Sequence, residues 1–144
     1  MKNFFSFVYS NFSKLKIGLM LTFLSSFGQT FVISLYVLQI TQEFEITKGQ
    51  FGAIYSACTI ISSLIMLTLG HTVDRIKAKR IIGLILTLLM FCALLMGFAF
   101  NLAMVIIALI GLRFCGQGML SHISFTLLSK IFSHNRGKAM SFAT

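Results

Sequence analysis

Three long runs without a charged residue dominate this sequence, at 17–42, 49–73 and 81–112. Each run can cross the roughly 30 Å apolar core of a bilayer, which takes about 20 helical residues. The chain is only 10% charged, whereas a soluble domain is about 25% charged, so it has too few polar side chains to cover a surface that faces water. The runs do not alternate apolar and polar residues as the strands of a membrane barrel do. They therefore predict an all-α, polytopic membrane helix bundle.

The last of these runs is too long for a single crossing. It contains 32 residues, and one helix of that length would extend about 48 Å at about 1.5 Å per residue. Asn101 is the only strongly polar residue near its middle, so we expect the helix to break there. The chain then has four complete transmembrane helices, at about 16–40, 50–70, 81–100 and 102–129.

The positive charges gather at alternate ends of the predicted spans. The formal net charge is +9, and the basic residues cluster before the first span, between the second and third spans, and after the fourth. The other two loops are net acidic or uncharged. Because basic loops stay on the cytoplasmic side, we expect a cytoplasmic N-terminus in a bacterial cytoplasmic (inner) membrane. The lipid bilayer, and no nucleic acid, is the partner that this pattern indicates.

Both ends of the chain carry short segments outside the complete spans. Residues 1–14 are the predicted cytoplasmic tail, in which Phe5 and Phe12 share an apolar helical face beside basic residues. That pattern is typical of a helix lying on a membrane surface. A new apolar run begins at Ala139 and is too short to span a bilayer, so we expect a truncated fifth helix there. The region 15–144 is then one helical membrane domain.

Polar side chains line one side of the first predicted span, within roughly 100° of arc at about 3.6 residues per turn. Lipid offers such a stripe no partner. It therefore faces either a neighbouring helix, through hydrogen bonds, or a water-filled substrate route. We take Gln29 as the best candidate for substrate contact, with Tyr36 further along. The stripe comprises Thr22, Ser25, Ser26, Gln29, Ile33 and Tyr36.

Arg113 is a charged residue deep inside a predicted span. It lies 11 residues beyond Asn101, which is about 16 Å at about 1.5 Å per residue. Burying an arginine there costs a few kcal/mol and is tolerated only where the side chain faces the bundle and finds partners. Gln117 and Ser121 lie further along the same helical face. We therefore predict that Arg113 and Gln117 lie on a substrate or proton pathway.

No grouping of reactive side chains indicates catalysis. The only carboxylate side chains belong to Glu43, Glu45 and Asp74, and all three lie in loops. The sequence has no glycine-rich phosphate loop, no nucleophile paired with a base, and no metal-ligand spacing of histidine and cysteine. We therefore expect no enzyme activity, no metal and no cofactor.

Three short segments carry recognisable patterns. Residues 70–80 form a charge-rich tight turn between the second and third spans. Residues 113–118 contain an arginine followed by two glycines, and residues 135–139 contain Arg-Gly-x-Ala before the last apolar run. The turn places a glycine, an Asp-Arg pair and a basic cluster in the order Gly70, Asp74, Arg75, Lys79 and Arg80.

Taken in this order, the three segments resemble the N-terminal third of a major facilitator superfamily transporter, over roughly residues 15–144. The resemblance implies part of the N-terminal half of that fold. Two positions depart from the family pattern: Lys77 stands where a glycine is usual, and Ala78 replaces a usual basic residue. A glycine there would permit a left-handed turn without steric cost, so we do not carry the exact turn geometry of the family over to Lys77.

The resemblance implies secondary active transport of a small solute by alternating access, completed by C-terminal helices that this chain lacks. The turn would be a cytoplasmic gating loop, with Asp74 against a helix N-terminus of the other half, a contact of about 0.3–1 kcal/mol when exposed. Two alternatives remain open. One is a non-transporting fragment of a truncated or split gene. The other is a small four-helix dimeric exporter, although such exporters rely on an acid in the first span, and 17–42 has none.

Overall fold

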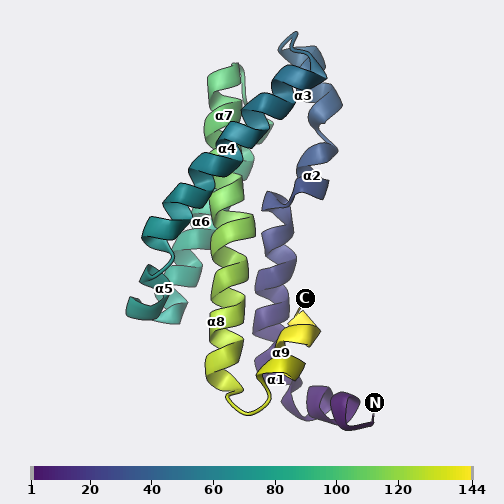
Figure 1. Ribbon diagram of the computed structural model, residues 1–144, viewed down its shortest axis with the longest axis vertical. Coiled ribbons are helices and arrows are strands. Elements are labelled where there is room, and N and C mark those ends of the chain that lie inside the picture. The colour runs from purple at the N-terminus through teal and green to yellow at the C-terminus, as the bar shows by residue number, and fades with distance from the viewer. Residues whose placement is uncertain (1, 144) are drawn as a thin grey trace.

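The computed structural model describes residues 2–143, except for the side chains of residues 2, 3, 72 and 74. Four helical stretches that are long and apolar enough to cross a membrane run along the molecule (Figure 1). No strand occurs among the described residues. The prediction of an all-α bundle with four membrane-spanning helices is confirmed. The four stretches are Phe4–Ser34, Lys48–Leu69, Ala78–Gly97 and Leu102–Ile131.

The first span is interrupted instead of forming one continuous helix. At Gln29 the backbone is extended, with φ −80° and ψ 150°. The expected continuous polar stripe is therefore wrong, because the extended residue changes the helical register of everything that follows it. The segments in order are α1 (Lys2–Ser25), the 3-10 turn η1 (Ser26–Gly28), α2 (Thr30–Ser34) and α3 (Val37–Glu43).

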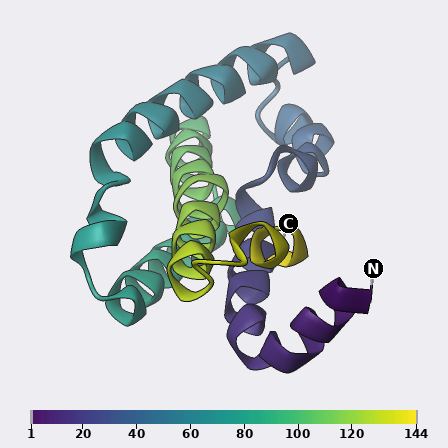
Figure 2. The same cartoon turned by 60° about the horizontal axis from the view of Figure 1, so that its bottom comes forward.

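The two ends of the chain pack against each other. The first turns of α1 bend away from the rest of the helix, and α1 contacts α9 (Arg136–Ala143) (Figure 2). The ring of Phe7 lies edge-on to that of Phe132, with centroids 5.3 Å apart, and Lys138 Nζ lies 5.8 Å from the centre of the Phe7 ring. These contacts join the start of the chain to the segment that follows the fourth span.

Helices α4 (Lys48–Leu69) and α6 (Ala78–Gly97) form the second and third spans. The start of α4 is set by a capping box in which Thr47 and Gln50 satisfy each other's backbone N–H groups. The connection between the two spans contains a further short helix, α5 (Thr72–Arg75), so it is not the simple tight turn expected from the sequence.

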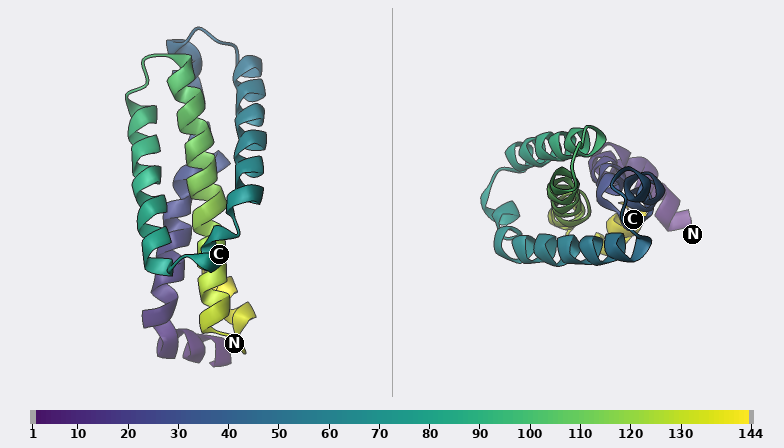
Figure 3. Two further views of the ribbon diagram at one scale, coloured as in Figure 1. Left: turned by 90° about the vertical axis from the view of Figure 1, so that its left-hand side faces the viewer. Right: turned by 90° about the horizontal axis from the view of Figure 1, so that it is seen from above.

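The fourth span lies at the centre, with the other spans around it (Figure 3). Half of its most apolar stretch is buried, compared with 11–28% for the other three spans. Its start is fixed by Asn101, whose side chain accepts a hydrogen bond from the backbone N of Met104 at 2.9 Å. The segments in order are α7 (Leu102–Leu112), the π-helix η2 (Arg113–Leu120) and α8 (Ser121–Ile131).

The interruption in the first span packs directly against the π-helix. A Cβ on Gly28 would lie 2.7 Å from Gln117 N and 2.9 Å from the Cα of Gly116. A Cβ on Gly116 would lie 2.6 Å from Gly28 N. Side chains at these two positions would collide with rigid backbone, so glycine alone permits the approach. The contact brings the carbonyl of Gly28 to the π-helix that begins with Arg113.

Candidate functional site

Arg113 is the first residue of η2 and the centre of the candidate site. Its side chain is only 8% exposed. Its Nη1 donates hydrogen bonds to the backbone oxygen of Gly28 at 3.3 Å and to Thr30 Oγ1 at 3.2 Å. Both acceptors flank the extended Gln29, where the helical hydrogen-bond ladder of the first span is interrupted. The break in one span thus supplies the partners that a buried arginine in another span needs.

Tyr55 on α4 forms the third side of this cluster. Its ring centre lies 5.0 Å from Cζ of Arg113, so the guanidinium rests over the negative face of the ring. The Tyr55 hydroxyl and Thr30 Oγ1 are 2.8 Å apart and share a hydrogen bond. Arg113, Thr30 and Tyr55 therefore join the first, second and fourth spans at one point.

The positive charge of Arg113 has no counter-ion among the described residues. The carboxylates of the sequence all lie outside the four spans. The buried Nε of Arg113 also has no hydrogen-bond partner. A buried donor without an acceptor costs about 1–3 kcal/mol, and more when the group is charged. The cluster therefore holds the guanidinium in place without neutralising it.

The π-helix that carries Arg113 is itself typical of functional positions. A π-helix bonds residue i to i+5, is rare, and is frequently found at functional sites. Here it coincides with the glycine-rich stretch whose Gly116 backbone lies against Gly28. The π-helix therefore lies where glycine allows the backbones of the first and fourth spans to come into contact.

A groove of about 430 Å³ opens beside Arg113, between α4 and η2, and the apolar side chains of Met66 and Leu67 line it together with polar ones. Its α4 side carries the hydroxyls of Thr59, Ser62 and Ser63, and its η2 side carries Arg113 and the exposed Gln117. Arg113 and Gln117 thus line the same groove, and their place on a substrate or proton pathway stays a prediction. Ser121, which the sequence placed on the same face, is not among the lining residues.

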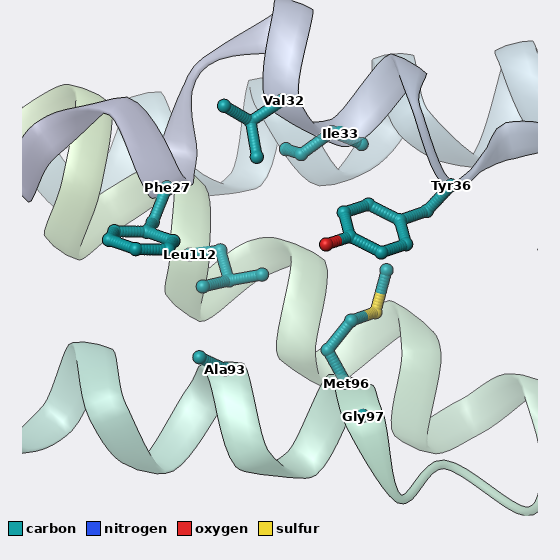
Figure 4. Close-up of a pocket in the computed structure, with 8 residues that line it drawn as sticks. All are labelled: Phe27, Val32, Ile33, Tyr36, Ala93, Met96, Gly97 and Leu112. Carbon is teal, nitrogen blue, oxygen red and sulfur yellow. The ribbon is translucent and has the colours of Figure 1, made fainter.

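The other two predicted pathway residues lie elsewhere. The Tyr36 hydroxyl points into a separate, mainly apolar pocket of about 210 Å³ between the first and third spans, opposite Leu112 and Met96 (Figure 4). Gln29 is half-buried and makes no side-chain hydrogen bond to a described residue, although its neighbours Gly28 and Thr30 both bind Arg113. The structure therefore does not bring the side chains of Gln29 and Tyr36 together with Arg113.

The predicted gating loop lies at the ends of α4 and α6 (Figure 1). Gly70 is buried there, and Arg75, Lys79 and Arg80 are exposed. The side chain of Asp74 lies outside the described residues. In the part of the chain that the structure describes, no group of three acidic, histidine or cysteine side chains could hold a metal ion.

Sequence reasoning missed Thr30 and Tyr55. One signal could have found Tyr55: a helical side chain leans toward the start of its own helix. The guanidinium of Arg113 therefore lies closer to the start of the fourth span than the Cα of Arg113 does. This is the level of Tyr55, an aromatic residue in the first half of α4, which runs in the same direction. No such signal marks Thr30, because its position depends on the break before it.

The Thr30 hydroxyl should contribute measurably to stability. Thr30→Val keeps the shape of the side chain but removes an acceptor of Arg113 and the partner of Tyr55. We expect the free energy of unfolding to fall by about 1–3 kcal/mol. Thermal unfolding in detergent, followed by a thiol-reactive dye that labels the buried Cys58, Cys92 and Cys115 as they become exposed, measures the change.

Ser34→Ala is the matched control, because the Ser34 hydroxyl is exposed and bonds only to the backbone oxygen of Phe31 in its own helix. If Thr30→Val unfolded at the same temperature as Ser34→Ala, the hydrogen-bond cluster would not stabilise the bundle.

Comparison with known proteins bears on the same region. A family model described as Major Facilitator Superfamily matches residues 18–144. No curated protein and no solved structure matches the chain.

Proposed function

Because the chain belongs to the major facilitator superfamily, whose members transport solutes across membranes, we propose that it serves the secondary active transport of a small solute by alternating access. The chain is an integral, multi-pass membrane protein. The observation that carries the proposal is Arg113, a buried guanidinium without a counter-ion beside an open groove that also carries hydroxyl groups. An intramembrane charge is costly and typically marks a substrate or proton route. Arg113 and Gln117 are the proposed contacts on that route.

Further helices complete the cavity in this proposal. Alternating access needs two helical units that rock about a site between them. Only 11% of the apolar stretch of α4 is buried, and the groove beside Arg113 is open on one side. These open faces favour partner helices of the same transporter, which would also meet the loop of residues 70–80. The proposed role of Asp74 there is contact with a helix N-terminus of the partner unit.

Transport measurements test the proposal. Deleting the coding sequence from its host should abolish the uptake of one solute class by membrane vesicles, in a panel of sugars, organic acids, amino acids and cationic drugs. The purified chain alone in liposomes should show no saturable counterflow of any of them. Unchanged uptake of the whole panel after deletion would favour a non-transporting fragment. Robust counterflow by the chain alone would show that no partner helices are needed.

The proposed orientation has a cytoplasmic N-terminus in a bacterial inner membrane. Single cysteines are placed at exposed positions in a variant that lacks the three native cysteines. Gln42→Cys should react with an impermeant thiol reagent in intact cells, whereas His71→Cys and Ser133→Cys should react only after the cells are opened. Labelling of Ser133→Cys from outside would contradict this orientation.

A further inference from the structure

We propose that the groove between α4 and η2 binds a small organic acid that carries hydroxyl or amino groups, with its carboxylate on the free edge of Arg113. This proposal deepens the proposed function, and only its transport step rests on that function. It is carried by the donors that Arg113 leaves unused, by the missing counter-charge, and by the hydroxyls on the opposite wall.

The guanidinium of Arg113 uses one nitrogen and leaves one edge free. Both of its hydrogen bonds leave from Nη1, toward Gly28 and Thr30. Nε has no partner, and Nη2 donates to no described residue. In a guanidinium, Nε–H and one Nη2–H are parallel and lie on the same edge. Because Nε is covered by protein atoms, a carboxylate in the groove accepts from Nη2 and reaches Nε only when those atoms move aside. A charge-assisted contact of this kind is roughly twice as strong as a neutral hydrogen bond.

The charge balance of the bundle favours an anion over a neutral ligand. No carboxylate of the sequence lies in any of the four spans, and no described side chain neutralises Arg113. The Tyr55 ring and the Thr30 hydroxyl orient the cation but leave its charge intact. A monoanion placed on the free edge removes an uncompensated buried charge, which an uncharged analogue of the same shape does not do.

The wall opposite Arg113 presents hydrogen-bond acceptors. The hydroxyls of Ser62 and Ser63 donate to the backbone oxygen of Thr59 at 3.0 Å and 2.8 Å. The Thr59 hydroxyl donates to the backbone oxygen of Tyr55 at 2.9 Å. Their protons are thus engaged within α4, while the oxygen lone pairs remain available to the groove. A ligand that fits both walls carries donors in addition to its carboxylate. The groove volume of about 430 Å³ lies within the range of about 300–1,000 Å³ found for small-molecule sites.

Thermal stabilisation of the purified full chain tests this inference with three probes of equal chain length. Gluconate has the carboxylate and the hydroxyls, gluconamide lacks the charge, and hexanoate lacks the hydroxyls. We expect gluconate to raise the midpoint of unfolding by several degrees in a saturable way at constant ionic strength. Gluconamide and hexanoate should each need at least roughly tenfold higher concentrations, since losing one good interaction costs about that factor.

Variants separate the two walls of the site. Arg113→Gln should abolish the difference between gluconate and gluconamide, and Arg113→Lys should restore it only in part, because lysine lacks the paired donors. Ser63→Ala should weaken the binding of gluconate toward that of hexanoate. Ser34→Ala, which lies off the groove, should leave the binding of all three probes unchanged. Should Arg113→Gln fail to fold, Ser63→Ala still carries the test.

Equal stabilisation by gluconate and gluconamide, or no stabilisation by either, would overturn the inference. Preference for gluconate that survives in Arg113→Gln would overturn it as well. The outcome is separable from that of the proposed function. Selective gluconate binding without any chain-dependent uptake in host vesicles would refute transport and leave the site standing. Chain-dependent uptake of a neutral or cationic solute, without gluconate binding, would support transport and refute the proposed carboxylate site.

Discussion

Gly28→Val is expected to prevent stable folding of the bundle. A Cβ at this position would lie 2.7 Å from the backbone N of Gln117 and 2.9 Å from the Cα of Gly116. These neighbours are main-chain atoms in the middle of a central helix, so no side chain can rotate to make room. Overpacking of a core commonly costs about 1–3 kcal/mol, and separating two spans also removes the partners of Arg113. We expect most of the protein to aggregate on size-exclusion chromatography in mild detergent.

Gly83→Val is the matched control, because a Cβ on Gly83 meets nothing within 4 Å. It introduces the same β-branched side chain into an apolar span and should give a single sharp peak with a nearly unchanged unfolding temperature. Gly116→Val should behave like Gly28→Val, since its Cβ would lie 2.6 Å from Gly28 N. If Gly28→Val and Gly83→Val gave equal yields of monodisperse protein, the close approach of the two backbones would be wrong.

Arg113→Ala is expected to reduce chain-dependent solute uptake by at least roughly a hundredfold, the scale of about 3 kcal/mol, in vesicles from the native host. The substitution removes the charge and the free donor edge that the proposed route requires. The amount of protein in the membrane should remain near that of the wild type. Alanine removes the few kcal/mol of insertion free energy that an uncompensated arginine costs in a span, and this gain offsets the loss of the hydrogen bonds to Gly28 and Thr30.

Two variants complete this comparison. Arg113→Lys keeps the charge without the paired donors, so its uptake should lie between those of the wild type and Arg113→Ala. Thr87→Val, on the exposed side of α6, removes a hydroxyl that bonds only to the oxygen of Gly83 and should transport normally. A parallel loss of protein and uptake in Arg113→Ala would mean that Arg113 is needed for folding instead of transport.

Much of the architecture could be predicted from the sequence, because membrane spanning depends on properties that sum locally. No charged residue lies in 17–42, 49–73 or 81–112, so each run can enter the bilayer whichever segments pack beside it. Asn101 marks the start of α7, because an amide side chain caps a helix through residues close by in sequence. The family followed from short motifs in order along the chain.

The candidate site could be predicted only in part. Arg113 and Gln117 line the same groove, as expected. A charge deep in an apolar span stands out on its own, and a spacing of four residues places the second side chain on the same side of a helix. Tyr36 was assigned to the same route by extending a regular helix through residues 26–36. The real backbone is extended at Gln29, so Tyr36 faces a different pocket, beside the third span.

What the sequence by itself determined is the list of spans and the presence of one buried cation that needs partners. What only the tertiary structure decided is which groups bind that cation. Arg113 binds Gly28 and Thr30, which lie 85 and 83 positions away. A break in a membrane helix is unfavourable alone, since it leaves backbone groups unpaired in lipid. It becomes favourable here because Gly28 and Gly116 let a second span approach closely and Arg113 donates to the freed carbonyl. No local sequence pattern encodes this compensation, because the broken helix and the arginine that binds its carbonyl belong to different spans.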